Sequence, residues 1–74
     1  MTDAEVEKFR EIFRAAILEV SKVYQKAIER LQLLQTKTVD PGLSTTVIFA
    51  IDTFSELQKS NDRLYFEVKK LLSF

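Results

Sequence analysis

Histidine and cysteine are both absent from this chain of 74 residues. Without cysteine there is no disulfide framework, no thiolate nucleophile and no thiolate metal site. Without histidine the chain lacks the commonest general base and metal ligand of proteins. Neither a glycine-rich phosphate loop nor an HExxH motif occurs in the sequence. We therefore expect a protein that is not an enzyme, with no catalytic residue, no metal site and no cofactor.

Glycine and proline occur only once each. All-β folds need many turns, and turns are built largely from Gly, Pro, Asn and Asp. So few turn residues favour a small number of long helices. Apolar residues make up 46% of the chain and charged residues 30%, so the chain has enough apolar material to fold. We expect a single all-α domain over residues 1–74.

Net charge is missing as well, because 11 basic residues balance 11 acidic ones. No large electric field would steer the chain onto nucleic acid or an anionic membrane. The longest apolar run, residues 47–51, is far too short for a membrane span. The start MTDAEVEKF contains no apolar segment of a secretory signal, and the lack of cysteine fits a reducing compartment. We expect an intracellular, cytoplasmic protein without a membrane span.

The first segment predicts a helix over about residues 3–36. Thr2 and Glu5 match the capping-box motif, in which each side chain binds the other's backbone N–H. The spacing of the apolar residues that follow is three and four, which is helical. They are Val6, Phe9, Phe13, Ala16, Val20, Val23, Ala27, Leu31 and Leu34. With Val6 as heptad position a, further apolar residues fill position e, as in the helices of globular bundles.

The second segment predicts a helix over about residues 41–73. Asp40 followed by Pro41 is typical of an N-cap and a first helical residue. Residues 45–51, TTVIFAI, are rich in β-branched side chains and taken alone resemble a strand. The wider apolar spacing is nevertheless helical, and its phase is the same on both sides of the polar stretch at residues 58–63. We expect one continuous helix; the alternative is a break near Ser60, which would give a three-helix bundle.

The short connection makes the two helices antiparallel neighbours in a long hairpin. We expect them to meet through positions a and d, with facing residue numbers that sum to about 77. One hairpin cannot cover all the remaining apolar residues, so we expect it to dimerise into a four-helix bundle. Another helical protein is the alternative partner. The candidate interface residues are Ile17, Tyr24, Ile28, Leu31, Ile48, Phe49, Ile51, Tyr65, Phe66, Leu72 and Phe74.

Two polar residues stand at apolar positions of the heptad pattern. Asn61 occupies position a, between Leu57 and Leu64, where an asparagine weakens a bundle but fixes its register. The alternative role for Asn61 is that of a helix cap, together with Ser60. Arg30 occupies position d, where its long stem can cover apolar surface while the guanidinium reaches water. Asn61 and Arg30 are therefore the candidate register-setting residues.

These features favour a protein–protein interaction module for oligomerisation, tethering or scaffolding, which works by burying amphipathic helix faces. The alternative is a small nucleic-acid-binding or regulatory bundle that uses a basic row of Lys22, Lys26 and Arg30. Acidic neighbours flank that row, which favours an ordinary solvated face. A third hypothesis is a groove beside Phe49 and Phe66 that holds a helical peptide.

Overall fold

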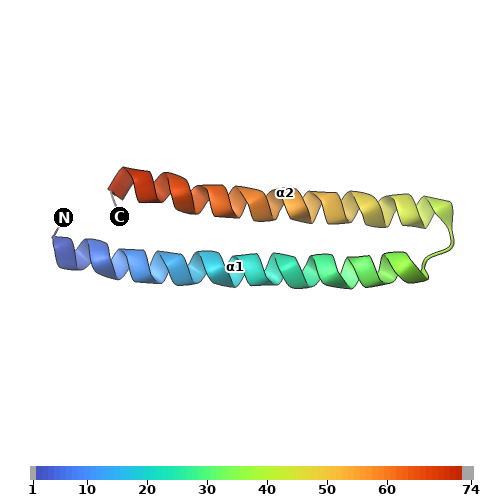
Figure 1. The fold of residues 1–74 in the computed structure, drawn as a ribbon, viewed down its shortest axis with the longest axis horizontal. Helices are drawn as coiled ribbons and strands as arrows, with labels where there is room; N and C mark the ends of the chain where they lie inside the picture. The colour runs from blue at the N-terminus through green and yellow to red at the C-terminus, as the bar shows by residue number, and fades with distance from the viewer. Residues whose placement is uncertain (1, 73–74) are drawn as a thin grey trace.

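The chain is a helical hairpin. The computed structural model describes residues 2–72, and within this range α1 (Asp3–Lys37) and α2 (Pro41–Leu72) run antiparallel along their whole length (Figure 1). The predicted all-α hairpin is confirmed, with helix bounds that differ from the expected ones by a single residue at the end of α1. The expected last residue of the second helix lies outside the described residues.

The capping box predicted at the start of α1 is present. The Glu5 N–H donates to Thr2 Oγ1 at 3.2 Å, and the Thr2 N–H donates to Glu5 Oε1 at 3.4 Å. Two backbone donors that no helical carbonyl can reach are thereby satisfied.

Threonine hydroxyls bind carbonyls near the end of α1. The Thr36 hydroxyl donates to the Leu33 carbonyl at 2.7 Å, and the Thr38 hydroxyl donates to the Leu34 carbonyl at 2.8 Å. The backbone of Thr38 is extended, so the helix ends there without the glycine that commonly follows a helix.

Asp40 caps α2, as its position before a proline predicted. The Leu43 N–H donates to Asp40 Oδ1 at 2.9 Å, and the Ser44 N–H donates to the Asp40 carbonyl at 2.9 Å. The ring of Pro41 lacks an N–H, and none is needed at the first position of a helix. The turn between the helices is therefore only three residues long, 38–40.

Residues 45–51 are helical despite their β-branched composition. The hydroxyl of Thr45 donates to the Pro41 carbonyl at 2.9 Å, and the hydroxyl of Thr53 donates to the Phe49 carbonyl at 2.9 Å. A threonine in a helix can satisfy its hydroxyl in this way. The helix also continues without interruption through Ser60, so the three-helix alternative is wrong.

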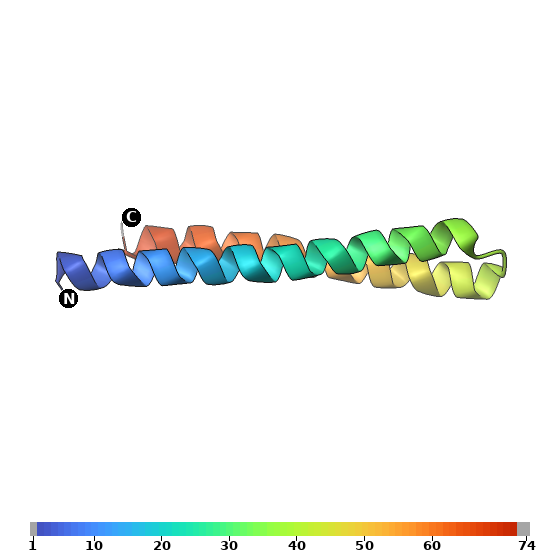
Figure 2. The ribbon, with the colours of Figure 1, turned by 90° about the horizontal axis from the view of Figure 1, so that it is seen from below.

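The hairpin is long and thin. It measures 57 × 16 × 11 Å, and its radius of gyration is 17.1 Å, whereas a compact domain of this length has a radius of about 11 Å. Figure 2 shows the two helices crossing at a shallow angle, with no further layer on either side. Among residues 2–72 only Ile28 and Val47 are buried, at 6% and 4% exposure, so most apolar residues in this range keep one side in solvent.

Candidate interaction surfaces

The two helices pack through positions a and e. The rings of Phe13 and Tyr65 lie 6.3 Å apart, and those of Tyr24 and Phe54 lie 6.1 Å apart; each is a contact between an a residue and an e residue. The facing numbers sum to about 78, close to the register expected from the short turn. The expected pairing of a with d is wrong, because the described helices present a and e to each other.

Position e prevails over position d because of the side chains on α1. There, e carries Ile17, Tyr24 and Leu31, whereas d carries the small Ala16 and the charged Arg30. Two helices alone cover only a narrow stripe of each other, so one of three apolar rows must stay outside. Packing through e buries more apolar area on α1 and leaves the d row exposed.

We call the contact between the two helices the seam. Polar side chains lie near its middle. The Asn61 side-chain amide donates across it to the Ile17 carbonyl at 3.0 Å. The Gln58 amide lies one turn away, at 3.3 Å from the Ser21 carbonyl and 3.3 Å from Gln25 Oε1. All are hydrogen bonds between the helices, so Asn61 is a seam residue and not a helix cap. Its role as a register-setting residue stays a prediction.

The seam drifts around α1 toward the turn. Ile28, at position b, is buried, whereas Val20 and Leu34, at position a, are exposed by 40% and 45%. A helix with 3.6 residues per turn rotates by about 20° for every seven residues relative to an apolar repeat of 3.5. The a residues nearest the turn are therefore rotated out of the seam, toward the side that carries the d row.

The large apolar residues at position d of both helices are exposed, and we call them together the outer row. Because the helices are antiparallel and both use a and e, the d positions of both lie on the same side of the hairpin. Its large members are exposed by between 43% and 81%. They are Phe9, Val23, Leu43, Leu57, Leu64 and Leu71.

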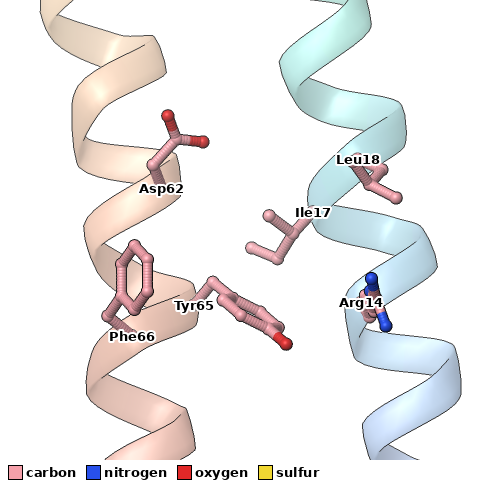
Figure 3. A pocket seen from close by; sticks show the side chains of 6 residues that line it. All are labelled: Arg14, Ile17, Leu18, Asp62, Tyr65 and Phe66. Carbon is pink, nitrogen blue, oxygen red and sulfur yellow. The ribbon is translucent and has the colours of Figure 1, made fainter.

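A groove of about 380 Å³ lies on the other side of the hairpin (Figure 3). The side chains of Ile17 and Tyr65 form its floor between the helices, and the ring of Phe66 stands edge-on to Tyr65 at 5.8 Å. Its remaining lining residues are Arg14, Leu18 and Asp62. The groove offers an apolar surface with one charge of each sign at its rim.

The candidate interface residues divide between seam and surface. Seven of them are half-buried or buried in the seam between the helices: Ile17, Tyr24, Ile28, Leu31, Ile51, Tyr65 and Leu72. Three are exposed: Ile48 by 43%, Phe49 by 71% and Phe66 by 57%. Phe74 lies outside the described residues. Whether any of the ten binds a partner stays a prediction.

Phe49 and Phe66 do not line one groove, as the peptide-binding hypothesis would require. Phe66 belongs to the groove between the helices, whereas Phe49 edges a shallow hollow of about 310 Å³ on the outer side of α2. They are also 17 positions apart on one helix, or about 25 Å along its axis.

The leucines of the outer row are candidate surface residues that sequence reasoning assigned to the contact between the helices. Leu57 and Leu64 were expected to face α1 in the seam, yet they are exposed by 43% and 51%. The sequence signal that could have identified them is the presence of apolar residues at three heptad positions, a, d and e. A hairpin can bury only two of these rows between its helices.

Three exposed ion pairs lie along the surfaces of single helices. They are Arg10–Glu7, Lys59–Glu56 and Lys70–Glu67, at 3.4 to 3.7 Å. Exposed pairs of this kind contribute little to stability. The residues of the basic row are exposed too. Arg30 lies at position d, on the same side of α1 as the outer row.

Among residues 2–72, neither helix combines the length and the apolar content that crossing a membrane requires. Comparison of the chain with protein-family models, with curated proteins and with solved structures finds no match.

Proposed function

We propose that the chain is a non-enzymatic protein–protein interaction module that associates with a second copy of itself to form a four-helix bundle. Such a bundle would serve for oligomerisation, tethering or scaffolding. The observation that supports this proposal is the outer row, a line of large apolar residues exposed along one side of a thin hairpin. Contiguous exposed apolar surface of this length is typical of an interaction site.

The exposed area supports a second copy as the partner. The hairpin exposes 5866 Å², whereas a folded monomer of 8.6 kDa exposes about 4,700 Å². The excess is about 1,200 Å² per chain, so that pairing two hairpins would bury about 2,400 Å² in total. Obligate homodimers bury 2,000 Å² or more, so one additional copy is enough to remove the excess.

The proposal predicts that a charge in the outer row separates the copies. Leu57 lies near the middle of that row, so Leu57→Glu would place a carboxylate in the apolar interface. We expect this variant to be monomeric at concentrations where the unmodified chain is dimeric, as measured by light scattering after size-exclusion chromatography.

Phe49→Glu is the matched control. Phe49 is more exposed than Leu57 and lies at position c, on the side of α2 that faces away from the seam, although Leu57 lines the same shallow hollow. We expect this variant to keep the mass of the unmodified chain. Equal behaviour of the two variants would contradict the proposal that the outer row is the interface.

A further inference from the structure

Four residues on α1 form a second line beside the outer row. Ile12, Glu19, Lys26 and Leu33 follow one another at intervals of seven and occupy position g, which borders position d on the helix surface. Ile12 is exposed by 61% and Leu33 by 58%, so neither is covered within the hairpin. Their burial would require another molecule on this side of α1.

This line of residues is complementary to the same line on a second copy that runs in the opposite direction. If α1 lies antiparallel to α1 of a second copy, Ile12 faces Leu33 of that copy and Glu19 faces its Lys26. An apolar residue then meets an apolar residue, and an acid meets a base. All four contacts share one centre, between residues 22 and 23, and that centre lies level with Leu57, near the middle of the outer row.

We propose that the second copy binds antiparallel, α1 against α1 and α2 against α2, with the two-fold axis crossing the bundle at the level of Val23 and Leu57. This proposal rests on the proposed self-association and adds the orientation of the partner and the residues that select it. A two-fold interface of this kind uses the same patch on both copies, as the self-complementary line requires.

The other two-fold arrangement, with its axis along the helices, lacks this complementarity. It would place α1 of one copy over α2 of the other at the same level. Ile12 would then face Glu67, and Leu33 would face Thr46. Two exposed apolar residues would meet a charged and a polar side chain, and the pairs between Glu19 and Lys26 would be lost.

Arg30 also favours the antiparallel arrangement. Apart from Lys37, the last residue of α1, it is the only charged residue at position d of the two described helices. With the axis along the helices, both copies of Arg30 would lie in the same layer of the core, which is unfavourable for like charges. In the antiparallel dimer the two are far apart, and each lies level with Ala16 of the other copy, whose small side chain leaves room for the arginine stem.

Charge reversal tests this orientation. Glu19→Lys places one lysine opposite Lys26 of the other copy in each of the two symmetric contacts. Lys26→Glu likewise places one acid opposite each Glu19. We expect each single reversal to weaken the dimer on the order of tenfold at low salt, because two attractive pairs become two repulsive ones. The double variant should recover the affinity of the unmodified chain. Sedimentation velocity over a concentration series gives the dissociation constants, and circular dichroism confirms that each variant stays helical.

Lys22 and Glu29 provide the matched control. They carry the same two charges at the same interval of seven on α1, but at position c, which faces away from the seam and from the outer row. Lys22→Glu and Glu29→Lys should leave the dissociation constant unchanged within a factor of two or so. Equal effects of the reversals at both places would overturn the proposed orientation.

A disulfide provides a second and independent readout. The chain has no cysteine of its own, so Val23→Cys introduces a single thiol next to the proposed axis. In the antiparallel dimer the two thiols lie on adjacent helices, and oxidation should link most chains covalently, whereas Phe49→Cys should not. With the axis along the helices, residue 23 of the two copies lies on diagonal helices and the link does not form. A dimer that gives neither the link nor charge recovery would overturn the orientation alone; a monomeric unmodified chain would overturn the proposed function as well.

Discussion

At the scale of single residues, we expect the hydrogen bonds of the amides in the seam to favour one register of the hairpin. Asn61 reaches the Ile17 carbonyl at 3.0 Å, and Gln58 reaches the Ser21 carbonyl at 3.3 Å. A slip of one helix by one turn would move both amides away from these acceptors and place them against apolar side chains. Buried polar groups cost stability when they lose a hydrogen-bond partner, so the slipped register is penalised.

Replacing Asn61 with leucine should therefore raise stability and reduce specificity. The Ile17 carbonyl lies within α1 and keeps its helical bond, so no buried group loses its only partner, while leucine adds apolar contact in the seam. We expect the free energy of unfolding to rise by about 1 kcal/mol in a chemical melt.

The same variant should broaden the distribution of oligomeric states seen by sedimentation. Gln58→Leu, which removes the neighbouring amide, is the comparison. A loss of about 0.5–2 kcal/mol on changing Asn61 to leucine is the result expected for a helix cap, and it would contradict a seam position.

At the scale of helices, the most informative feature is that α2 is continuous across the polar stretch at residues 58–63. Its seam positions 47, 51, 54, 58, 61, 65 and 68 alternate in steps of four and three, and the polar side chains fall into that pattern without a change of phase. Ser60 is exposed and takes no part in the seam, so it can be changed without altering the packing.

Proline at position 60 tests this continuity. In the interior of a helix, Ser60→Pro removes a backbone hydrogen bond and clashes with the preceding turn, which costs about 3 kcal/mol. Ser60→Ala should instead be neutral or slightly stabilising, because alanine has the higher helix propensity. Circular dichroism during urea unfolding measures both variants, and a well-tolerated proline would show that a new helix starts near this residue.

Much of this level of structure follows from the sequence. The pairs Thr2–Glu5 and Asp40–Pro41 mark the two helix starts, and the unbroken apolar phase around Asn61 predicts a continuous second helix. The sequence does not show whether the residues at position d or those at position e pack between the helices. Its periodicity indicates apolar residues at positions a, d and e without showing which of them are buried. That choice depends on the summed packing of side chains from both helices, in which Ala16 and Arg30 weaken row d of α1.

At the scale of the whole molecule, the hairpin has the long, thin shape expected for half of the four-helix bundle that we propose. Its radius of gyration is 17.1 Å, and only two of the residues that the structure describes are buried, so this part of the chain has almost no core of its own. The outer row, together with Ile12 and Leu33 beside it, supplies the apolar surface that a second hairpin would cover. Stability and association would then be coupled, so that the midpoint of thermal unfolding rises with protein concentration.

The molar mass of the unmodified chain tests self-association most directly. Sedimentation equilibrium at micromolar concentration should give about 17 kDa, twice the 8.6 kDa of one chain, if two hairpins form the bundle. The same sample should be almost fully helical by circular dichroism. A helical, cooperatively folded species that remains at 8.6 kDa over the whole concentration range would contradict the proposed function.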